Sequence, residues 1–370
     1  MMDAVWLVLP GLCIWTTILL LPWRPWSTSE SLEATSGSTT DLSEITILIP
    51  ARNEAPYILT TLRSLSAQGP NHKIILIDDG STDNTATLAG SLQLPNMNII
   101  NGKPLASGWS GKLWALEQGR LQADTKYLLL LDADIRLEPG LVPALLNKLK
   151  QDELQFISLM AFLRMETMWE KMLMPAFIYF FKLLYPFRLS NSASRLVAAA
   201  AGGCILIDRR VLEEIGGFSA VKDQLIDDCA LARRVKNHGY RTWIGLSHGA
   251  LSLRCYEGLQ TIWEMVARTA FTQLRYSGLL LVVCTFLMLS AFVIPVAGIF
   301  SGHVISITLS CLTILLMILS YLPTLNYYNV NLLWACTLPV TGLLYLLMTW
   351  NSAINYWRGI GASWKGRNYA

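Results

Sequence analysis

One long block of the sequence contains no charged residue, and this block limits what the chain can fold into. Asp, Glu, Lys and Arg are all absent from residues 276–357, and a second block without charge covers residues 4–23. A helix needs about 20 apolar residues to cross a hydrocarbon core of about 30 Å. The longer block divides at weakly polar points into candidate spans at 278–299, 304–322 and 332–350. The sequence therefore predicts transmembrane helices, about three segments, within residues 276–357.

The N-terminal block is expected to be an uncleaved membrane anchor, residues 1–26. A signal peptide would need a basic start and a small-residue cleavage site, whereas this block starts with Asp3 and ends in Pro-Trp-Arg-Pro-Trp. Arg24 favours a cytoplasmic position for the residues that follow. Three further crossings would then place the basic tail, residues 358–370, outside, against the same rule. One segment that enters the membrane and returns to the same side would place the basic tail in the cytoplasm. Pro295 and Pro339 mark possible breaks in the helices for such a segment.

The charged residues lie outside the two apolar blocks and predict a domain that faces water. All 29 Lys and Arg and all 26 Asp and Glu belong to this remainder, and the net charge of +3 gives no reason to expect a nucleic-acid partner. Residues 27–44, rich in Ser and Thr, are expected to form a flexible linker. Residues 172–187 are aromatic and too short to span, which favours an interfacial segment over the alternative of a buried core helix.

Short apolar runs alternate with helical spacing from residue 45 onward. The runs at 45–49, 73–77 and 127–131 predict buried strands, residues 98–100 are a possible further strand, and residues 56–66 have helical spacing. Strands that alternate with helices predict a mostly parallel sheet that binds its ligands at the carboxyl ends of the strands. Two acidic pairs, Asp78-Asp79 and Asp132-Ala-Asp134, directly follow predicted strands.

The pair Asp132 and Asp134 is a candidate metal site. Two close carboxylates repel each other, and a hard divalent cation relieves the repulsion. Mg²⁺ and Mn²⁺ take carboxylate oxygens and complete their shells with substrate phosphates and water. The seven cysteines show no CxxC spacing, so neither a zinc site nor a disulfide framework is expected.

The motifs, taken in order, resemble the family 2 glycosyltransferases of GT-A fold. The matching segments are ITILIPARNE (45–54), IDDGSTDNT (77–85), Gly111-Lys112, Asp132-Ala-Asp134, GGCILIDRRVLEEIGGF (202–218) and IDDCAL (226–231). Further segments resemble the hopene-associated glycosyltransferases of bacterial hopanoid gene clusters: PAFIYFFKLLYPF (175–187), AAAAGGC (198–204), MVARTAFTQLRYS (265–277) and WKGR (364–367). The resemblance implies a Rossmann-like catalytic domain at residues 45–275 with a mostly parallel sheet.

The resemblance also implies roles for individual residues. Asp79 would bind the base of a nucleotide-sugar donor, a UDP-sugar being the expected one, and Lys112 would lie near the diphosphate. Asp134, with Asp132 as its partner, would hold Mg²⁺ or Mn²⁺. The remaining implied donor-site residues are Pro50, Ala51, Arg52, Glu54 and Gly203. Gly202 and Gly203 would let the backbone approach the sugar or the acceptor, with a tight helix–strand contact as the alternative.

The resemblance implies an inverting reaction with Asp228, preceded by Asp227, as the catalytic base. Polymer-making members carry (Q/R)xxRW; with its Arg aligned on Arg275, Thr272 and Tyr276 replace the Gln and Trp, and Gln273 is one position off. This departure counts against a processive polysaccharide synthase and leaves Gln273 and Arg275 as site candidates, with Arg275 assigned to the donor site. An interfacial anchor is the alternative for Arg275. His248 is expected to be structural.

The leading hypothesis is a multi-pass enzyme of the cell inner membrane with a cytoplasmic catalytic domain. It would transfer a sugar, of hexosyl type, from a nucleotide-sugar to the hydroxyl of a membrane lipid, with a hopanoid as the expected acceptor. The alternatives are a processive polysaccharide synthase and a catalytically inactive membrane scaffold or binding protein. Product size would distinguish the first alternative, and hydrolysis of the sugar nucleotide without acceptor would argue against the second.

Overall fold

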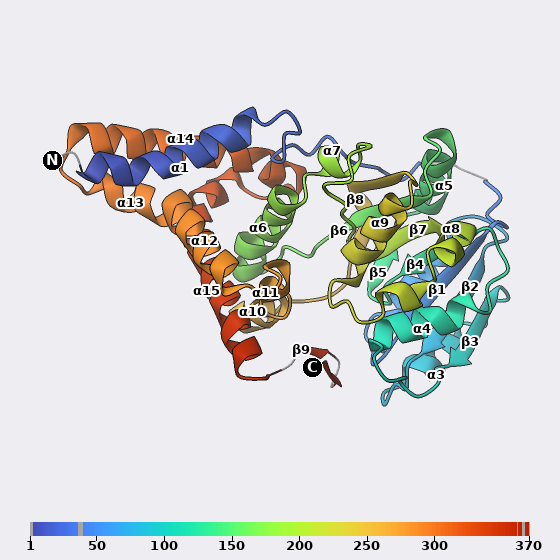
Figure 1. The fold of residues 1–370 in the computed structure, drawn as a ribbon. Coiled ribbons are helices and arrows are strands. Elements are labelled where there is room, and N and C mark those ends of the chain that lie inside the picture. Colours follow the sequence, from blue (N-terminus) through green and yellow to red (C-terminus); the bar gives the residue numbers. More distant parts are fainter. Residues whose placement is uncertain (1–2, 36–39, 361, 365–366, 370) are drawn as a thin grey trace. The chain divides into compact units, whose positions relative to one another are not determined.

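The computed structural model describes residues 3–35, 40–360, 362–364 and 367–369. The chain divides into two compact units, each built from separate stretches of sequence (Figure 1). The sheet domain consists of residues Glu30–Arg164 and Phe187–Cys255, and the helical unit consists of Met1–Ser29, Met165–Pro186 and Tyr256–Ala370. The chain therefore passes from one unit to the other at residues 29–30, 164–165, 186–187 and 255–256.

The sheet domain is built on one mixed, mostly parallel sheet in the order β3-β2-β1-β4-β7-β6-β8-β5. The pairs β1–β2, β1–β4, β2–β3 and β6–β8 are parallel, and the pairs involving β7 or β5 are antiparallel. This confirms the predicted fold class and the possible strand at residues 98–100. The strands are β1 (Ile45–Ala51), β2 (Lys73–Asp78), β3 (Met97–Asn101), β4 (Tyr127–Leu131), β5 (Ile135–Leu137), β6 (Phe156–Phe162), β7 (Cys204–Asp208) and β8 (Thr242–Ser252).

Helices cover both faces of the sheet because alternate strand residues point to opposite sides. In β1, Ile47 belongs to the core beneath α2 (Ile58–Ser66), α3 (Thr85–Ser91) and α5 (Leu141–Gln151), whereas Leu48 belongs to the opposite core. That second core lies beneath a different set of helices. They are α4 (Gly111–Arg120), α8 (Arg209–Glu214), the 3₁₀ helix η1 (Phe218–Val221) and α9 (Asp227–Asn237).

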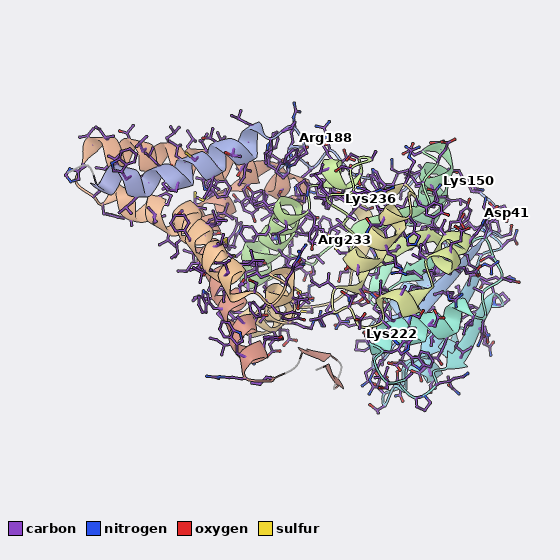
Figure 2. The ribbon with its side chains drawn as sticks, in the orientation of Figure 1. Asp41, Lys150, Arg188, Lys222, Arg233 and Lys236 are labelled. Atoms are coloured by element: carbon purple, nitrogen blue, oxygen red, sulfur yellow. The ribbon has the colours of Figure 1, made fainter. Side chains whose placement is uncertain are left out.

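Helix α9 is tied to the segment around α7 (Phe187–Ser190) by a buried lysine. Lys236 donates to the carbonyl oxygens of Ser190 and Val197, the latter at 2.8 Å, and burial lowers its pKa to about 8. Figure 2 labels Lys236 among charged residues that all belong to the sheet domain. This lysine fixes the carboxyl end of the helix whose first turn carries Asp228.

Part of the segment expected to be a linker lies along β8. Ser31 pairs with Leu246 as an isolated parallel bridge, and Leu32 N donates to Leu246 O at 2.9 Å. Glu33 contacts His248 through Oε1 and Nδ1, 2.8 Å apart. Residues 30–33 therefore follow the sheet, and His248 has the structural contact that the sequence predicts.

The helical unit combines three parts of the chain. Its helices are α1 (Asp3–Leu20), α6 (Met168–Leu184), α10 (Leu259–Ala267), α11 (Ala270–Gln273), α12 (Gly278–Met288), the π-helical turn η2 (Leu289–Val293), α13 (Ile294–Ile299), α14 (Val304–Tyr327), the 3₁₀ helix η3 (Leu332–Thr337) and α15 (Leu338–Trp357). A short hairpin follows, with β9 (Ala362–Trp364) antiparallel to β10 (Arg367–Tyr369).

Three helices are long and apolar enough to cross a membrane: Gly278–Ile299, Val304–Tyr327 and Leu332–Trp357. The predicted segments are therefore present, and the second and third extend further than the sequence indicates. Pro295 does not end the first helix, because it follows the wider π-helical turn η2. Pro339 lies in the first turn of α15, where a missing backbone N–H is tolerated. The number of true crossings stays a prediction.

Helix α1 packs against α14 and α13, although these helices are far apart in the sequence (Figure 1). Trp15, fully buried, donates its indole Nε1–H to Ala291 O at 2.9 Å. Gly11 allows the closest approach, since a Cβ there would lie 2.3 Å from Ser290 O. The N-terminal helix is therefore a packed member of the helical unit, and its role as an anchor stays a prediction.

Helix α6 is largely buried within the helical unit. Tyr179 shares a hydrogen bond of 2.7 Å with Ser320 of α14, and Tyr345 of α15 donates to Leu173 O at 2.9 Å. Lys182, 1% exposed, donates to Ser27 O and Thr324 Oγ1, both at 3.1 Å. Burial of this helix agrees with the alternative of a core helix, and an interfacial location for residues 172–187 stays a prediction.

Candidate active site

The loops after β1 and β2 are joined to each other by hydrogen bonds. Arg52 donates from Nη1 to Asp79 O at 2.6 Å, and Asp79 N donates to Ala51 O at 2.8 Å. Glu54 N donates to Thr85 Oγ1 at 2.8 Å. Because β1 and β2 are parallel, their carboxyl ends meet at the same edge of the sheet. The structure thus brings together the residues predicted at the nucleotide loop, and Pro50, aligned with Ile77, lies at the same edge.

Strand β7 brings the Gly202-Gly203 pair next to the acidic pair after β4. Leu131 at the end of β4 is paired with Cys204 at the start of β7, and Asp132 N donates to Gly203 O at 3.0 Å. A Cβ on Gly203 would make only ordinary contacts with Ile135. Gly203 therefore takes part through its carbonyl oxygen, which fixes the backbone at Asp132.

Lys112 connects three elements of the site. Its Nζ lies 2.5 Å from Asp132 Oδ1 and donates to Gly202 O at 3.1 Å. Burial alone would lower the pKa of Lys112, but the carboxylates of Asp132, Asp227 and Asp228 raise it above its ordinary value. The ammonium group therefore stays protonated and supplies a fixed positive charge at this edge of the sheet.

Asp228 lies in the first turn of α9 and faces the same glycine. Its Oδ1 accepts from Cys229 N at 2.7 Å, and a Cβ on Gly202 would lie 3.3 Å from Oδ2 and 3.1 Å from Lys112 Nζ. Burial, reinforced by the charge of Asp227, raises the pKa of Asp228 to about 7. A carboxylate with this pKa can gain and lose a proton near neutral pH, as a general base requires.

Asp134 is bound by an arginine that the sequence analysis did not identify. Arg254 Nε donates to Asp134 Oδ2 at 2.7 Å, and Arg254 Nη2 donates to Glu54 Oε1 at 3.1 Å. Pairing of Ile135 with Ser252 sets this position, and Leu253 N donates to Asp134 O at 2.8 Å. Arg254 is separated from both carboxylates by more than a hundred residues, so no spacing in the sequence pointed to it.

Asp132 and Asp134 fit a metal that arrives together with a phosphate-bearing ligand. Burial raises the pKa of Asp132, Lys112 opposes the shift, and the charge of Asp134 adds to it, so the carboxylates are close enough to repel. Among the described residues, no group of three or more His, Cys, Asp or Glu could hold a metal ion. Two carboxylates match the small share of ligands that proteins supply to Mg²⁺, with phosphate and water as the rest.

The two candidates near the start of the apolar block belong to the helical unit. Gln273 Oε1 accepts from the hydroxyl of Tyr185 at 2.5 Å. Arg275 has a left-handed backbone, with φ of 51°, in the turn before α12. A role for either residue in donor binding stays a prediction.

Comparison with known proteins finds similarity in the sequence of the sheet domain. The model of the family described as Glycosyl transferase family 2 matches residues 46–216. A 4,4'-diaponeurosporenoate glycosyltransferase of Staphylococcus aureus (strain MRSA252) is 38% identical over 106 residues, and the homologue of strain USA300 is 35% identical over 105 residues. Each match covers 28% of this chain and 28% of the relative, so the chain matches little more than a quarter of their length.

The fold also has a counterpart among solved structures. The mannosyltransferase PcManGT from Pyrobaculum calidifontis, solved in complex with GDP-Man and Mn²⁺, has a TM-score of 0.59 at 16% identity. The likeness covers 95% of this chain and 98% of that one, and at this identity it concerns the fold alone. The fold is thus of the Rossmann-like GT-A type with a mostly parallel sheet, and residues 46–216 within it match the model of Glycosyl transferase family 2.

Proposed function

We propose that this protein transfers a sugar from a nucleotide-sugar to the hydroxyl group of a membrane lipid, with inversion at the anomeric carbon. The observation that carries the proposal is the cluster of Lys112, Asp132 and Asp228 around Gly202, at the carboxyl edge of the sheet. It combines a fixed positive charge, a carboxylate suited to metal binding and a carboxylate that titrates near pH 7. These are the three elements that displacement of a diphosphate by a hydroxyl requires.

Donor binding is assigned to the joined loops after β1 and β2. Buried Asp79 would accept a hydrogen bond from the base, and we infer uracil, hence a UDP-sugar of hexosyl type. Arg52, bonded to Asp79 O and Gly80 O, keeps this loop in place rather than contacting the base through the same Nη1. Lys112 would contact the diphosphate. Mg²⁺ or Mn²⁺ bound by Asp132 and Asp134 would supply positive charge that stabilises the leaving diphosphate.

Catalysis is assigned to Asp228. Its Oδ1 accepts from Cys229 N, and the carboxylate also accepts from the backbone N–H of Gly202. We infer that Oδ2, which lies beside Gly202, would take the proton. The acceptor oxygen forms a bond to the anomeric carbon while the bond from that carbon to the diphosphate oxygen breaks, and the diphosphate leaves with the electron pair. Attack opposite the leaving group inverts the anomeric carbon.

The lipid acceptor is inferred from the apolar helices and from the relatives. Three helices of the helical unit are long and apolar enough to span a membrane, and the curated relatives are named for 4,4'-diaponeurosporenoate. We propose a hopanoid as the acceptor, because motifs along the chain resemble the hopene-associated glycosyltransferases. The same reasoning assigns the enzyme to the cell inner membrane, with the sheet domain on the cytoplasmic side, where nucleotide-sugars are made.

The domain boundaries drawn from the sequence are kept as part of the proposal. They separate an anchor (1–26), a linker (27–44), a catalytic domain (45–275), membrane helices (276–357) and a basic tail (358–370). The compact units differ from these boundaries, because residues 165–186 and 256–275 belong with the helices and residues 30–35 and 40–44 belong with the sheet domain.

The test is transfer by the purified full chain in lipid nanodiscs that contain a hydroxylated hopanoid. With a panel of UDP- and GDP-sugars and Mn²⁺ or Mg²⁺, mass spectrometry should find one hopanoid species heavier by a single sugar residue. The Asp228→Asn protein is the matched control, since it keeps the shape of the side chain and removes the base. A long polymer would instead support the polysaccharide synthase, and absence of both transfer and sugar-nucleotide hydrolysis would overturn the proposal.

A further inference from the structure

Arg254 joins two carboxylates that come from different strands of the site. Its guanidinium bonds Asp134 through Nε at 2.7 Å and Glu54 through Nη2 at 3.1 Å, and it lies 5.8 Å from the ring centre of Tyr57. The side chains of Glu54 and Asp134 are 7% and 12% exposed, and that of Arg254 is 33% exposed. The arginine therefore covers two nearly buried carboxylates and itself remains partly open to solvent.

This arrangement places a protein cation on the carboxylate that the proposed function assigns to the metal. A charged hydrogen bond of this length is strong, and two carboxylates in a nearly buried site repel each other. In the absence of donor, Arg254 neutralises them. A divalent cation at Asp134 competes with the guanidinium for the same negative charge and is repelled by it at close range.

We propose that Arg254 is an exchangeable counter-cation, which must release Asp134 before Asp134 can bind a metal. This inference rests on the proposed function, because it takes Asp134 as a metal ligand. Glu54 makes the exchange possible, because its buried carboxylate can hold Arg254 after the guanidinium has released Asp134. Arg254 is thus a positioning residue that makes metal binding depend on the arrival of the diphosphate, which brings further oxygen ligands. Metal without nucleotide would bind weakly.

The inference predicts that loss of Arg254 tightens metal binding to the nucleotide-free protein. Electron paramagnetic resonance of unbound Mn²⁺ would be measured during titration of the purified full chain with Mn²⁺ alone. Arg254→Met should lower the Kd by about tenfold or more, on the scale of second-shell effects on metal sites. Arg254→Lys should lower it by less, because an ammonium keeps the charge and cannot bridge both carboxylates in the same geometry.

The matched control is Arg136→Met, which removes the same charge from the neighbouring strand β5. Arg136 pairs with Glu138 at 2.6 Å, and both side chains are more than 40% exposed. Its Kd should stay within about twofold of wild type, because an exposed charge is screened by water. In an Asp134→Ala background the effect of Arg254→Met should disappear.

An unchanged or weaker Kd in Arg254→Met would overturn the inference and would show that Arg254 orients Asp134 for the metal. A tightening that persists without Asp134 would overturn it as well. So would the absence of measurable binding to the Arg254→Met protein at millimolar Mn²⁺. If Arg254→Met does not fold, the same comparison is made with Arg254→Lys. Sugar transfer by the wild-type enzyme is measured separately, so failure of the proposed function is distinguishable from failure of the exchange.

Discussion

The edge of the sheet with the candidate site and the helical unit bury polar groups in opposite ways. At the sheet edge, carboxylates meet cations: Asp132 with Lys112, and Asp134 and Glu54 with Arg254. In the helical unit, the described buried polar groups are mainly hydroxyls, and Thr313 and Ser320 bond to carbonyl oxygens of their own helix. The buried charged residues described there, Glu170 and Lys182, both lie on α6.

The difference shows what each region can do. Paired charges in a partly dry site keep altered proton affinities and can respond to an incoming anion. Hydroxyls such as those of Thr313 and Ser320 bond within their own helix and need neither water nor an opposite charge. The buried hydroxyls of Ser290, Ser306, Ser310 and Thr341 have no hydrogen-bond partner among the residues that the structure describes. In the sheet domain, Lys236 is held by the carbonyl oxygens of Ser190 and Val197, and burial lowers its pKa. Burial by itself thus changes proton affinity, and the pairing of carboxylates with Lys112 and Arg254 is what distinguishes the charged edge of the sheet.

The strongest test of the comparison removes the base from the charged edge. Asp228→Asn should reduce kcat by about 10³-fold, within the range of general-base catalysis, because Oδ2 could no longer take the acceptor proton. Steady-state kinetics with donor and lipid acceptor would measure it, and circular dichroism would confirm an unchanged fold. Activity within tenfold of wild type would remove Asp228 from the mechanism.

The packing of the helical unit can be broken at one glycine. Gly11→Ala places a Cβ about 2.3 Å from Ser290 O, a backbone atom that cannot move alone. The free energy of unfolding, measured in detergent micelles, should fall by about 1–3 kcal/mol relative to wild type, which is the usual cost of overpacking a core. Gly278→Ala is the control in the same unit, since its Cβ would meet nothing within 4 Å. Equal stability of the two variants would mean that α1 is not packed as described.

The pH dependence of kcat/KM tests whether Asp228, at the charged edge of the sheet, acts as the base. Asp228 acts as a base only when deprotonated, so kcat/KM should fall as pH drops below about 7. The charge of Asp227 contributes to the raised pKa of Asp228, and Asp227→Asn should therefore move this acidic limb to lower pH. The logarithm of kcat/KM plotted against pH reports the shift. A limb that stays in place or moves upward would contradict the assignment.

The smallest effect is expected where a buried cation has carbonyl and hydroxyl partners. Lys182→Met keeps the length of the side chain, removes a charge from an apolar site and loses the bonds to Ser27 O and Thr324 Oγ1. These terms oppose each other, so the free energy of unfolding should change by about 1 kcal/mol or less. Arg254→Met, by contrast, removes the cation that bonds the nearly buried carboxylates of Asp134 and Glu54 and should cost about 3–5 kcal/mol. Chemical denaturation measures the free energy of unfolding of both variants. A decrease above about 3 kcal/mol for Lys182→Met would show that the two buried cations do not differ in this way.

The sequence allowed much of the sheet and its acidic loops to be predicted because both depend on local patterns. β-branched and Leu-rich runs identify β1, β2 and β4, and the carboxyl ends of parallel strands place Asp79, Asp132 and Asp134 at one edge. The apolar block identifies its own helices by length alone. Lys112 and Asp228 were found through the family resemblance, since neither has a local pattern of its own.

Residues whose role depends on distant pairing were not predictable. Arg254 reaches Asp134 only because β8 pairs antiparallel with β5, a register that no spacing reveals. Helix α6 looks interfacial in the sequence, and its buried side arises from α14 and α15, which come much later. The contacts of residues 30–33 with β8 likewise lie in a Ser- and Thr-rich segment without apolar periodicity.

The discontinuous helical unit sets an order for the synthesis of the protein. Every residue of the sheet domain has been made once residue 255 has left the ribosome, whereas α6 still lacks its partners on α14 and α15 at that moment. The hydrogen bond between Tyr179 and Ser320 and the one from Tyr345 to the carbonyl oxygen of Leu173 can form only after α14 and α15 have been made. In a nascent chain stopped before α14, the apolar helix α6 would thus lack the partners that bury it, although the sheet domain is already complete. Helices α14 and α15 are therefore needed to complete the packing around α6, which is synthesised long before them.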